Sequence, residues 1–214
     1  MTDFFSARFA RALAFAHELH RKQKRKTSGA PYVAHLLGVA ALVMEDGGSE
    51  DEAIAALLHD SLEDQGRHYP GGVEALAAEI EREFGPDVVR LVDTLTERIG
   101  PDERAISDKR ARWRAHKLAY IRQIGSAEAR VRRISCADSI YNVRSLTRDY
   151  LRMGDEMWTR FLTRSRDDQL WAYDGVARAL EAAGGGPLAG ELNRAVDELF
   201  RATGTERPAS TSPR

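Results

Sequence analysis

The stretch Ala55–Asp64 carries the residues of this chain that are best suited to chemistry. If it is helical, its apolar residues share one face and its polar residues share the opposite face. The polar residues are His59, Asp60, Glu63 and Asp64. No lysine or arginine in the stretch balances the three carboxylates, and negative charge is unfavourable near the C-terminal end of a helix. A bound cation would resolve both problems, whereas the alternative is a solvated polar face.

Two more residues with metal-ligating side chains occur in apolar surroundings. His35 lies within the otherwise apolar segment Tyr32–Met44, and Asp138 continues an apolar stripe that includes Ile134. A single histidine in such a position is commonly a hydrogen-bonded core residue. A buried carboxylate without a partner is costly, so Asp138 predicts either a bound metal or an arginine partner. Asn142 follows one helical turn later on the same face.

Together these residues form a mixed nitrogen and oxygen ligand set. The candidate ligands are His35, His59, Asp60 and Asp138. Such a set suits Mn²⁺, Fe²⁺ or Zn²⁺ and differs from a thiolate zinc site. Four protein ligands leave coordination positions for water and a phosphate oxygen, and the cation would acidify that water. Glu63 and Asp64, one turn after the expected ligands, are predicted to act as general acid or base.

Helical periodicity covers nearly the whole chain, and no alternating strand pattern occurs. We expect helices over residues 9–20, 32–44, 49–64, 73–84, 87–97, 109–124, 127–146, 157–183 and 188–202. Ser49 is expected to cap the third of these. The elements predict an all-α fold around one core. We expect a single main domain over residues 1–183, an accessory helix over 184–202, and a disordered tail over 203–214, which is rich in Ser, Thr and Pro.

Composition narrows the class of protein further. The 214 residues are 43% hydrophobic and 30% charged with a formal net charge of −1, which argues against a protein that coats polyanions. The single cysteine, Cys136, cannot form an intramolecular disulfide and indicates a reducing compartment. No signal-peptide pattern or apolar run long enough for a membrane span is present. We therefore expect a cytoplasmic protein without a membrane partner.

Three sequence blocks resemble the HD phosphohydrolase superfamily, and more narrowly the hydrolase domain of the Rel/Spo alarmone enzymes and the stand-alone small alarmone hydrolases. The blocks are Arg25–His35, Ala55–Asp64 and Ala137–Arg144. The resemblance implies an HD-domain helical bundle within residues 1–183. It also implies hydrolysis of the 3′-diphosphate of guanosine tetra- or pentaphosphate, with release of pyrophosphate. One divalent ion per chain is expected, Mn²⁺ first, with Fe²⁺ or Zn²⁺ as alternatives.

The same resemblance implies roles for individual residues. The metal ligands would be the four residues named above, and Glu63 and Asp64 would activate the water. The expected substrate-binding residues are Arg25, Lys26, Ser28, Tyr32, Asn142 and Arg144. Among them, Arg25 would stack on the base and Asn142 would contact the ribose. The chain departs from the family pattern at Leu36, where a proline is usual, and at Ser139, where a lysine or arginine is usual.

Three alternatives to this function stay open. The substrate could be another nucleotide, such as an adenosine alarmone or a phosphorylated nicotinamide dinucleotide. The protein could be a non-catalytic nucleotide sensor, although a pure binder has no need of Glu63 and Asp64. The basic run Arg21–Lys26 could bind nucleic acid, but its place shortly before His35 favours contact with substrate phosphate. We therefore expect a nucleotide substrate and no nucleic-acid partner; the sequence leaves the oligomeric state unspecified.

Overall fold

The computed structural model describes residues 5–184 and 186–209, and the predicted all-α class is confirmed over them. The α-helices are α1 (Ala7–His20), α2 (Val33–Glu45), α3 (Glu50–Leu58), α4 (Gly72–Phe84), α5 (Pro86–Leu95), α6 (Pro101–Ala105), α7 (Lys109–Ser126), α8 (Ala129–Met153), α9 (Arg166–Ala182) and α10 (Gly186–Ala202). The only β-type pairing among the described residues is an isolated bridge between Lys24 and Pro31.

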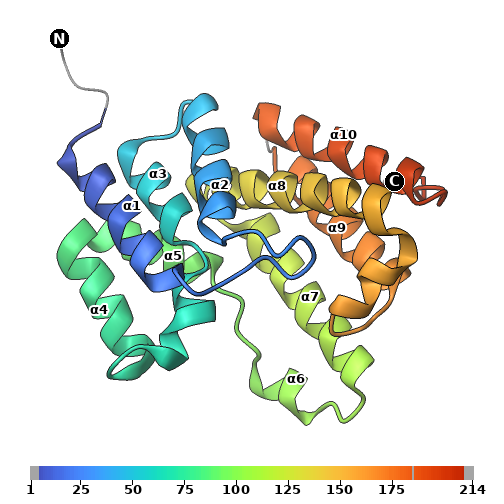
Figure 1. Ribbon diagram of the computed structural model, residues 1–214, viewed down its shortest axis with the longest axis horizontal. Helices are drawn as coiled ribbons and strands as arrows, with labels where there is room; N and C mark the ends of the chain where they lie inside the picture. Colours follow the sequence, from blue (N-terminus) through green and yellow to red (C-terminus); the bar gives the residue numbers. More distant parts are fainter. Residues whose placement is uncertain (1–4, 185, 210–214) are drawn as a thin grey trace.

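The long helix α8 is the centre of the fold. It packs against α2, α3, α5, α7, α9 and α10, and it crosses the middle of the molecule in Figure 1. The buried apolar residues form one continuous core that extends from α1 to α10. Leu192, Val196 and Leu199 of α10 belong to this core and are fully buried. The helix expected to be accessory therefore shares the core of the main domain, while a domain boundary at residue 183 stays a prediction.

Side-chain caps fix where two of the helices near the site begin. The hydroxyl of Ser6 accepts a hydrogen bond from the backbone N–H of Arg8 at the start of α1. Ser49 caps α3, as expected, and forms a capping box: Glu52 Oε2 accepts from the Ser49 backbone N–H at 2.8 Å, and Ser49 Oγ accepts from the Glu52 N–H. These bonds satisfy backbone donors that the first turn leaves free.

The helix expected over 49–64 does not continue to its predicted end. The α-helix stops at Leu58, and a π-helical turn follows over Ser61–Gln65. His59 and Asp60 lie at the junction between the two. A π-helical turn is wider than an α-turn and often occurs at functional sites, and sequence periodicity does not distinguish it from an α-helix. The spacing of Glu63 and Asp64 from His59 and Asp60 is therefore not that of a regular helix face.

The second half of the chain differs from expectation at three connections. Helix α8 continues past Leu146 to Met153 and ends at Gly154, whose φ of 60° is available to glycine at little cost. The helical region expected over 157–183 is interrupted: a 3₁₀ segment ends at Arg160, and α9 begins after its cap Ser165. The connection between the helices expected over 87–97 and 109–124 contains the short helix α6.

The predicted disordered tail is corrected for its first residues. Arg207 Nε lies 2.7 Å from Asp174 of α9, and its Nη1 lies 2.8 Å from Asp197 of α10. Thr203 is buried, and its hydroxyl donates to the carbonyl of Leu199. The chain is thus attached to α9 and α10 as far as Arg207, and residues 210–214 of the prediction lie outside the described residues.

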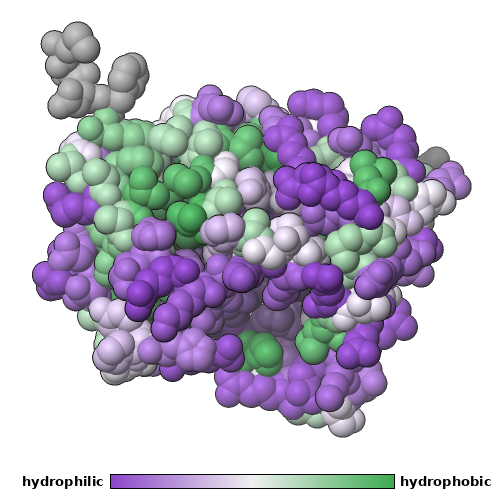
Figure 2. Space-filling view, viewed as in Figure 1, coloured by the Kyte–Doolittle hydropathy of each residue, from purple (hydrophilic) through white to green (hydrophobic). Residues whose placement is uncertain are grey.

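Hydrophilic residues cover most of the face shown in Figure 2, which is hollowed near its centre. Apolar residues gather at its upper left, over α1 and α2. Leu37 of α2 is 44% exposed, so this apolar helix is not covered on every side. Among the described helices, none combines the length and the apolar character needed to cross a membrane.

Helix α2 packs tightly on α8 at Gly38, and this contact gives a stability prediction. A Cβ atom at this position would lie 2.1 Å from Cε2 of Tyr141. Gly38→Ala should therefore lower the free energy of unfolding by about 1–3 kcal/mol, because the ring must move. In urea denaturation, the matched control Gly190→Ala on α10 should be neutral or stabilising by about 0.5–1 kcal/mol, because alanine loses less backbone entropy than glycine when the helix forms. Equal stability of both variants would contradict tight packing at Gly38.

Candidate active site

Four side chains from three parts of the chain converge at the centre of the fold. His35 comes from α2, His59 and Asp60 follow α3, and Asp138 comes from α8. The Nε2 atom of His35 lies 3.3 Å from Nε2 of His59, 3.4 Å from Asp60 Oδ2 and 3.2 Å from Asp138 Oδ1. The Nε2 atom of His59 lies 3.1 Å from Asp60 Oδ2 and 3.5 Å from Asp138 Oδ1. The expected ligands are thus brought together.

These distances fit a shared cation. Nitrogen and oxygen ligands lie about 2.0–2.2 Å from a zinc-like ion, which places neighbouring ligand atoms about 3.0–3.5 Å from each other. The Nδ1 atom of His59 lies 2.8 Å from the carbonyl oxygen of Ala56. If Nδ1 carries the proton of that hydrogen bond, Nε2 presents its lone pair to the centre, as in metal-ligating histidines. Two imidazole nitrogens and two carboxylate oxygens then face one point, which favours positive charge there.

The electrostatics of the cluster also favour positive charge. Burial acts to lower the pKa of His59, but the neighbouring Asp60 and Asp138 hold it well above its ordinary value. Burial acts to raise the pKa of Asp60, but His59 and His35 hold it well below its ordinary value, and the same balance lowers the pKa of Asp138. Both aspartates therefore keep their charge. A divalent cation would take the place of the proton that this field favours on His59.

A second layer of hydrogen bonds orients the carboxylates. The hydroxyl of Tyr32 donates to Asp60 Oδ2 at 2.5 Å, and Asn142 Nδ2 donates to Asp138 Oδ1 at 2.7 Å. Arg25 in turn donates to Asn142 Oδ1 at 2.6 Å. Asp138 is only partly buried, with 21% of its side chain exposed, and it has a polar partner. Its connection to arginine runs through Asn142.

A cavity of about 210 Å³ lies beside this cluster, with Tyr32 and Asn142 shared between the two. Its lining includes these predicted residues: Arg25, Lys26, Tyr32, Glu63, Asp64 and Asn142. It also includes residues that were not predicted: Gln23, Lys24, Thr27, Ser145, Leu146, Phe161 and Tyr173. The wall is therefore basic on one side, acidic on another and partly aromatic, which suits a ligand with phosphate groups and a ring.

Two of the predicted substrate-binding residues lie away from this cavity. Arg144 follows Asn142 by two residues, which on an α-helix is about 200° around the axis. It therefore faces α10, where its guanidinium lies 2.7 Å from Glu191. Ser28 is at the exposed tip of the loop between α1 and α2, and its hydroxyl accepts from the backbone N–H of Ala30. Neither residue lines this cavity, and substrate contact by them stays a prediction.

The two predicted acid–base residues differ in their surroundings. Glu63 is exposed, yet the surrounding protein and the negative charge of Glu97 raise the pKa of its carboxyl to about 7, and Lys117 opposes them. Asp64 instead accepts a hydrogen bond from Gln23 Nε2 at 2.6 Å. Glu63 is thus poised to change protonation near neutral pH, whereas Asp64 is fixed in orientation.

The loop that carries Arg25 is held at several points. The bridge between Lys24 and Pro31 closes its two ends. The hydroxyl of Thr27 donates to Asp149 of α8, and Arg160 donates to the carbonyl of Thr27 at 3.0 Å. The guanidinium of Arg25 lies within 6 Å of the ring centroids of both Tyr32 and Tyr141. This basic loop is therefore fixed over the cavity by residues from the C-terminal half of the chain.

Sequence reasoning missed the residues that support the site from other elements. Gln23 and Glu97 occupy segments that were read as a basic loop and a helix end, and no spacing rule marks them. Phe161 and Tyr173 come from a region read only as helical packing. His20 also supports the site: it stacks on Tyr32 with ring centroids 5.2 Å apart, and its Nδ1 lies 2.7 Å from Gln23 Oε1.

Comparison with known proteins agrees with this arrangement. The family model described as HD domain matches residues 12–165. A guanosine-3′,5′-bis(diphosphate) 3′-pyrophosphohydrolase, MESH1, from Xenopus tropicalis is 33% identical over 140 residues, covering 64% of this chain and 68% of that protein. The protein of the same name from Homo sapiens is 32% identical, covering 67% of this chain and 72% of that one.

A solved structure of a metazoan ortholog of SpoT, described as hydrolysing ppGpp, has a TM-score of 0.67 and 25% sequence identity. The alignment covers 95% of this chain and 99% of that one. The family match extends over well more than half of the sequence and includes all four residues of the central cluster. The chain belongs to the HD domain family.

Proposed function

We propose that this protein is a metal-dependent 3′-pyrophosphohydrolase of guanosine tetra- and pentaphosphate. The observation that carries the proposal is that the Nε2 atoms of His35 and His59 lie 3.1–3.5 Å from carboxylate oxygens of Asp60 and Asp138, beside a cavity with a basic and an acidic wall. The names of the relatives supply the substrate class, since those from Xenopus tropicalis and Homo sapiens are guanosine-3′,5′-bis(diphosphate) 3′-pyrophosphohydrolases.

In this proposal His35, His59, Asp60 and Asp138 hold one divalent ion, with Mn²⁺ expected first. Bound there, the ion would supply Lewis acidity toward a phosphate oxygen and lower the pKa of a water molecule. Tyr32 and Asn142 keep the two aspartates oriented through the hydrogen bonds at 2.5 and 2.7 Å. Such outer partners fix ligand geometry, and their loss commonly lowers metal affinity by about 10–100-fold.

Glu63 takes the role of general base toward the attacking water. A carboxyl with a pKa of about 7 accepts a proton near neutral pH and can return it afterwards, which suits this role. Asp64, held by Gln23, orients the water rather than accepting its proton. The charges of both carboxylates also disfavour a phosphate on their side of the cavity, so they direct it toward the basic loop.

The basic loop binds the phosphates and the nucleoside. Lys24, Arg25 and Lys26 all line the cavity, and the loop position is fixed by Thr27 and its partners. The flat guanidinium of Arg25 is already oriented by Tyr32, Tyr141 and Asn142, so little of its freedom is lost on binding a base or phosphate. Phe161 and Tyr173 offer aromatic surface on the same cavity.

Metal removal tests the proposal as a whole. Metal-stripped protein should release no pyrophosphate from guanosine tetraphosphate, and one equivalent of Mn²⁺ should restore release. A panel containing adenosine analogues and phosphorylated nicotinamide dinucleotides should react more slowly. Asp138→Asn keeps the shape but removes a charge, so bound metal should fall by about 10-fold or more by elemental analysis. Full activity in the chelated sample, or no hydrolysis of any nucleotide with Mn²⁺ bound, would end the proposal.

The role of Glu63 predicts a pH dependence. A base must be ionised, so kcat should rise with pH through a midpoint at or below about 7, since a nearby cation can only lower the pKa of a carboxyl. Glu63→Gln should lower kcat by about 10²–10⁴-fold and remove this midpoint while metal content stays constant. The control Glu18→Gln, whose side chain is 70% exposed on α1, should behave as wild type. A wild-type pH profile in Glu63→Gln would exclude Glu63 as the base.

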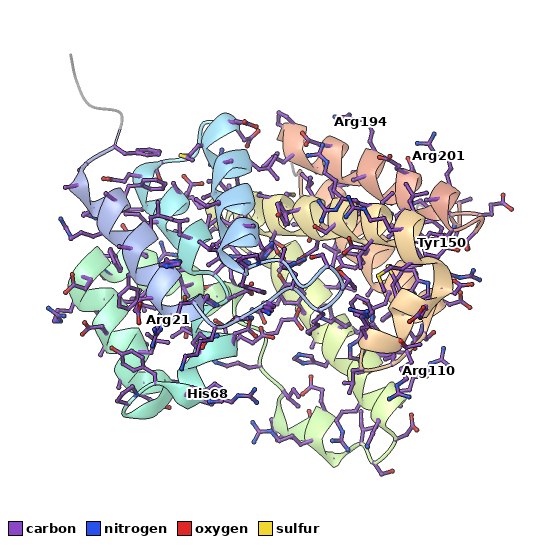
Figure 3. All side chains as sticks on the ribbon, viewed as in Figure 1. Arg21, His68, Arg110, Tyr150, Arg194 and Arg201 are labelled. Atoms are coloured by element: carbon purple, nitrogen blue, oxygen red, sulfur yellow. The ribbon has the colours of Figure 1, made fainter. Side chains whose placement is uncertain are left out.

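The basic loop predicts a different kinetic change. Arg25→Ala should raise KM by about 10-fold or more with unchanged metal content, because its charge-assisted contacts are to substrate. Arg21 is the matched control. It pairs with Glu18 and projects from the end of α1 near His68, on another groove of the surface (Figure 3). Arg21→Ala should leave KM within about twofold of wild type. Equal effects of the two variants would mean that general positive charge, and not the site of Arg25, binds the nucleotide.

A further inference from the structure

Glu97 connects the segment after α5 to the carboxylate of Glu63. The backbone N–H of Glu97 donates a hydrogen bond to Glu63 Oε2 at 3.2 Å. This bond crosses from the connection between α5 and α6 to the π-helical turn after α3. It is the backbone, and not the side chain, of Glu97 that reaches Glu63. The orientation of Glu63 therefore depends on how firmly this connection is held.

Helix α7 holds the connection through the side chain of Glu97. Lys117 Nζ donates to both carboxylate oxygens of Glu97, at 2.6 and 2.7 Å. The Nε2 atom of His116 lies 3.1 Å from Glu97 Oε2. The side chains of Glu97, His116 and Lys117 are 16%, 14% and 26% exposed, so water screens these contacts only partly. Two adjacent residues of one helix thus clamp a single carboxylate.

The Glu97 carboxylate is ionised, as its contacts with Lys117 and His116 require. Burial acts to raise the pKa of Glu97, but Lys117 and His116 reverse the effect and hold it below its ordinary value, so the group stays ionised. Its negative charge faces Glu63 from one side, and Asp60 and Asp64 face Glu63 from its own segment. Lys117 is the cation that opposes these three carboxylates. The hydroxyl of Tyr120, one turn further along α7, bonds to Ser135 of α8 and stays neutral.

We propose that Glu97 is a positioning residue for Glu63, and that Lys117 and His116 of α7 act through it. The inference rests on the proposed role of Glu63 and extends it to a residue from another part of the chain. The backbone N–H of Glu97 fixes one oxygen of Glu63 and leaves the other free for a water molecule. The carboxylate of Glu97 holds its own segment in place and contributes a negative charge that keeps Glu63 basic.

The first test uses Glu97→Gln, which keeps the shape of the side chain and the backbone N–H but removes the charge. The variant should retain its metal and a KM within about twofold of wild type, while kcat at neutral pH falls and the acid limb moves to lower pH by about 0.5 unit or more. Lys117→Met should lower kcat by about 10-fold through misplacement of Glu63. The double variant should lose less than the product of the two single losses, because both act through one contact.

Arg98→Met is the matched control. Arg98 is the residue next to Glu97, and its ion pair with Asp93 is exposed, at 56% and 48% of the two side chains. Removing this pair should leave kcat, KM and the pH profile unchanged. If Arg98→Met shifts the pH profile as much as Glu97→Gln does, the effect belongs to the segment in general and the inference fails. The inference also fails if Glu97→Gln and Lys117→Met lose activity independently of each other.

A measurement without turnover separates this inference from the proposed function. The carboxyl of Glu63 can be followed by ¹³C NMR titration in metal-free and in Zn²⁺-loaded protein, with its signal assigned by its loss in Glu63→Gln. Its midpoint should fall in Glu97→Gln and stay unchanged in Arg98→Met. An unmoved midpoint in Glu97→Gln would overturn the inference even in an active enzyme. If the Glu63 titration midpoint moves in Glu97→Gln but the protein hydrolyses no nucleotide, the link between Glu97 and Glu63 stands and only the proposed function is refuted.

Discussion

The arrangement depends on holding four electron-rich atoms around one point. The Nε2 atoms of His35 and His59 lie within 3.5 Å of each other and of carboxylate oxygens of Asp60 and Asp138, which is unfavourable without positive charge between them. The fold tolerates this because the four side chains are held by three separate parts of the chain. Helix α8 supplies Asp138 from the middle of the core, and the break after α3 supplies His59 and Asp60. The rigid scaffold thus holds the central cluster in an arrangement that is itself unfavourable.

The residues around this point are separated by charge. Acidic groups, Glu63 and Asp64, lie on the side of the π-helical turn, and basic groups lie on the loop after α1. Asn142 stands between them and bonds to both Asp138 and Arg25. A substrate phosphate drawn to the basic side would therefore lie next to the metal ligands. The same asymmetry gives a chain with a net charge of −1 a locally basic wall in this cavity.

The all-α class, most helix positions and the residues of the central cluster were predictable from the sequence. Periodicity identifies helices, and a histidine or aspartate in an apolar stripe is conspicuous because burial makes it costly. The π-helical turn was not predictable, because a local widening leaves the apolar spacing unchanged. The position of Arg144 outside the cavity was not predictable for a related reason: membership of a motif says nothing of which side of α8 a residue faces. Glu97 and Gln23 were missed because their roles arise only from tertiary contacts with distant segments.

The loop that carries Arg25 has a consequence for how the protein is made. Its contacts join positions far apart in the chain: Arg25 to Asn142 across 117 residues, Thr27 to Asp149 across 122, and Thr27 to Arg160 across 133. Contacts of such high sequence separation form late, because a long loop must close before they contribute. Helices α1 to α5 emerge from the ribosome first, but the cavity beside the central cluster cannot close until α8 and the segment after it have emerged. Synthesis of a binding-competent molecule is therefore tied to completion of most of the chain.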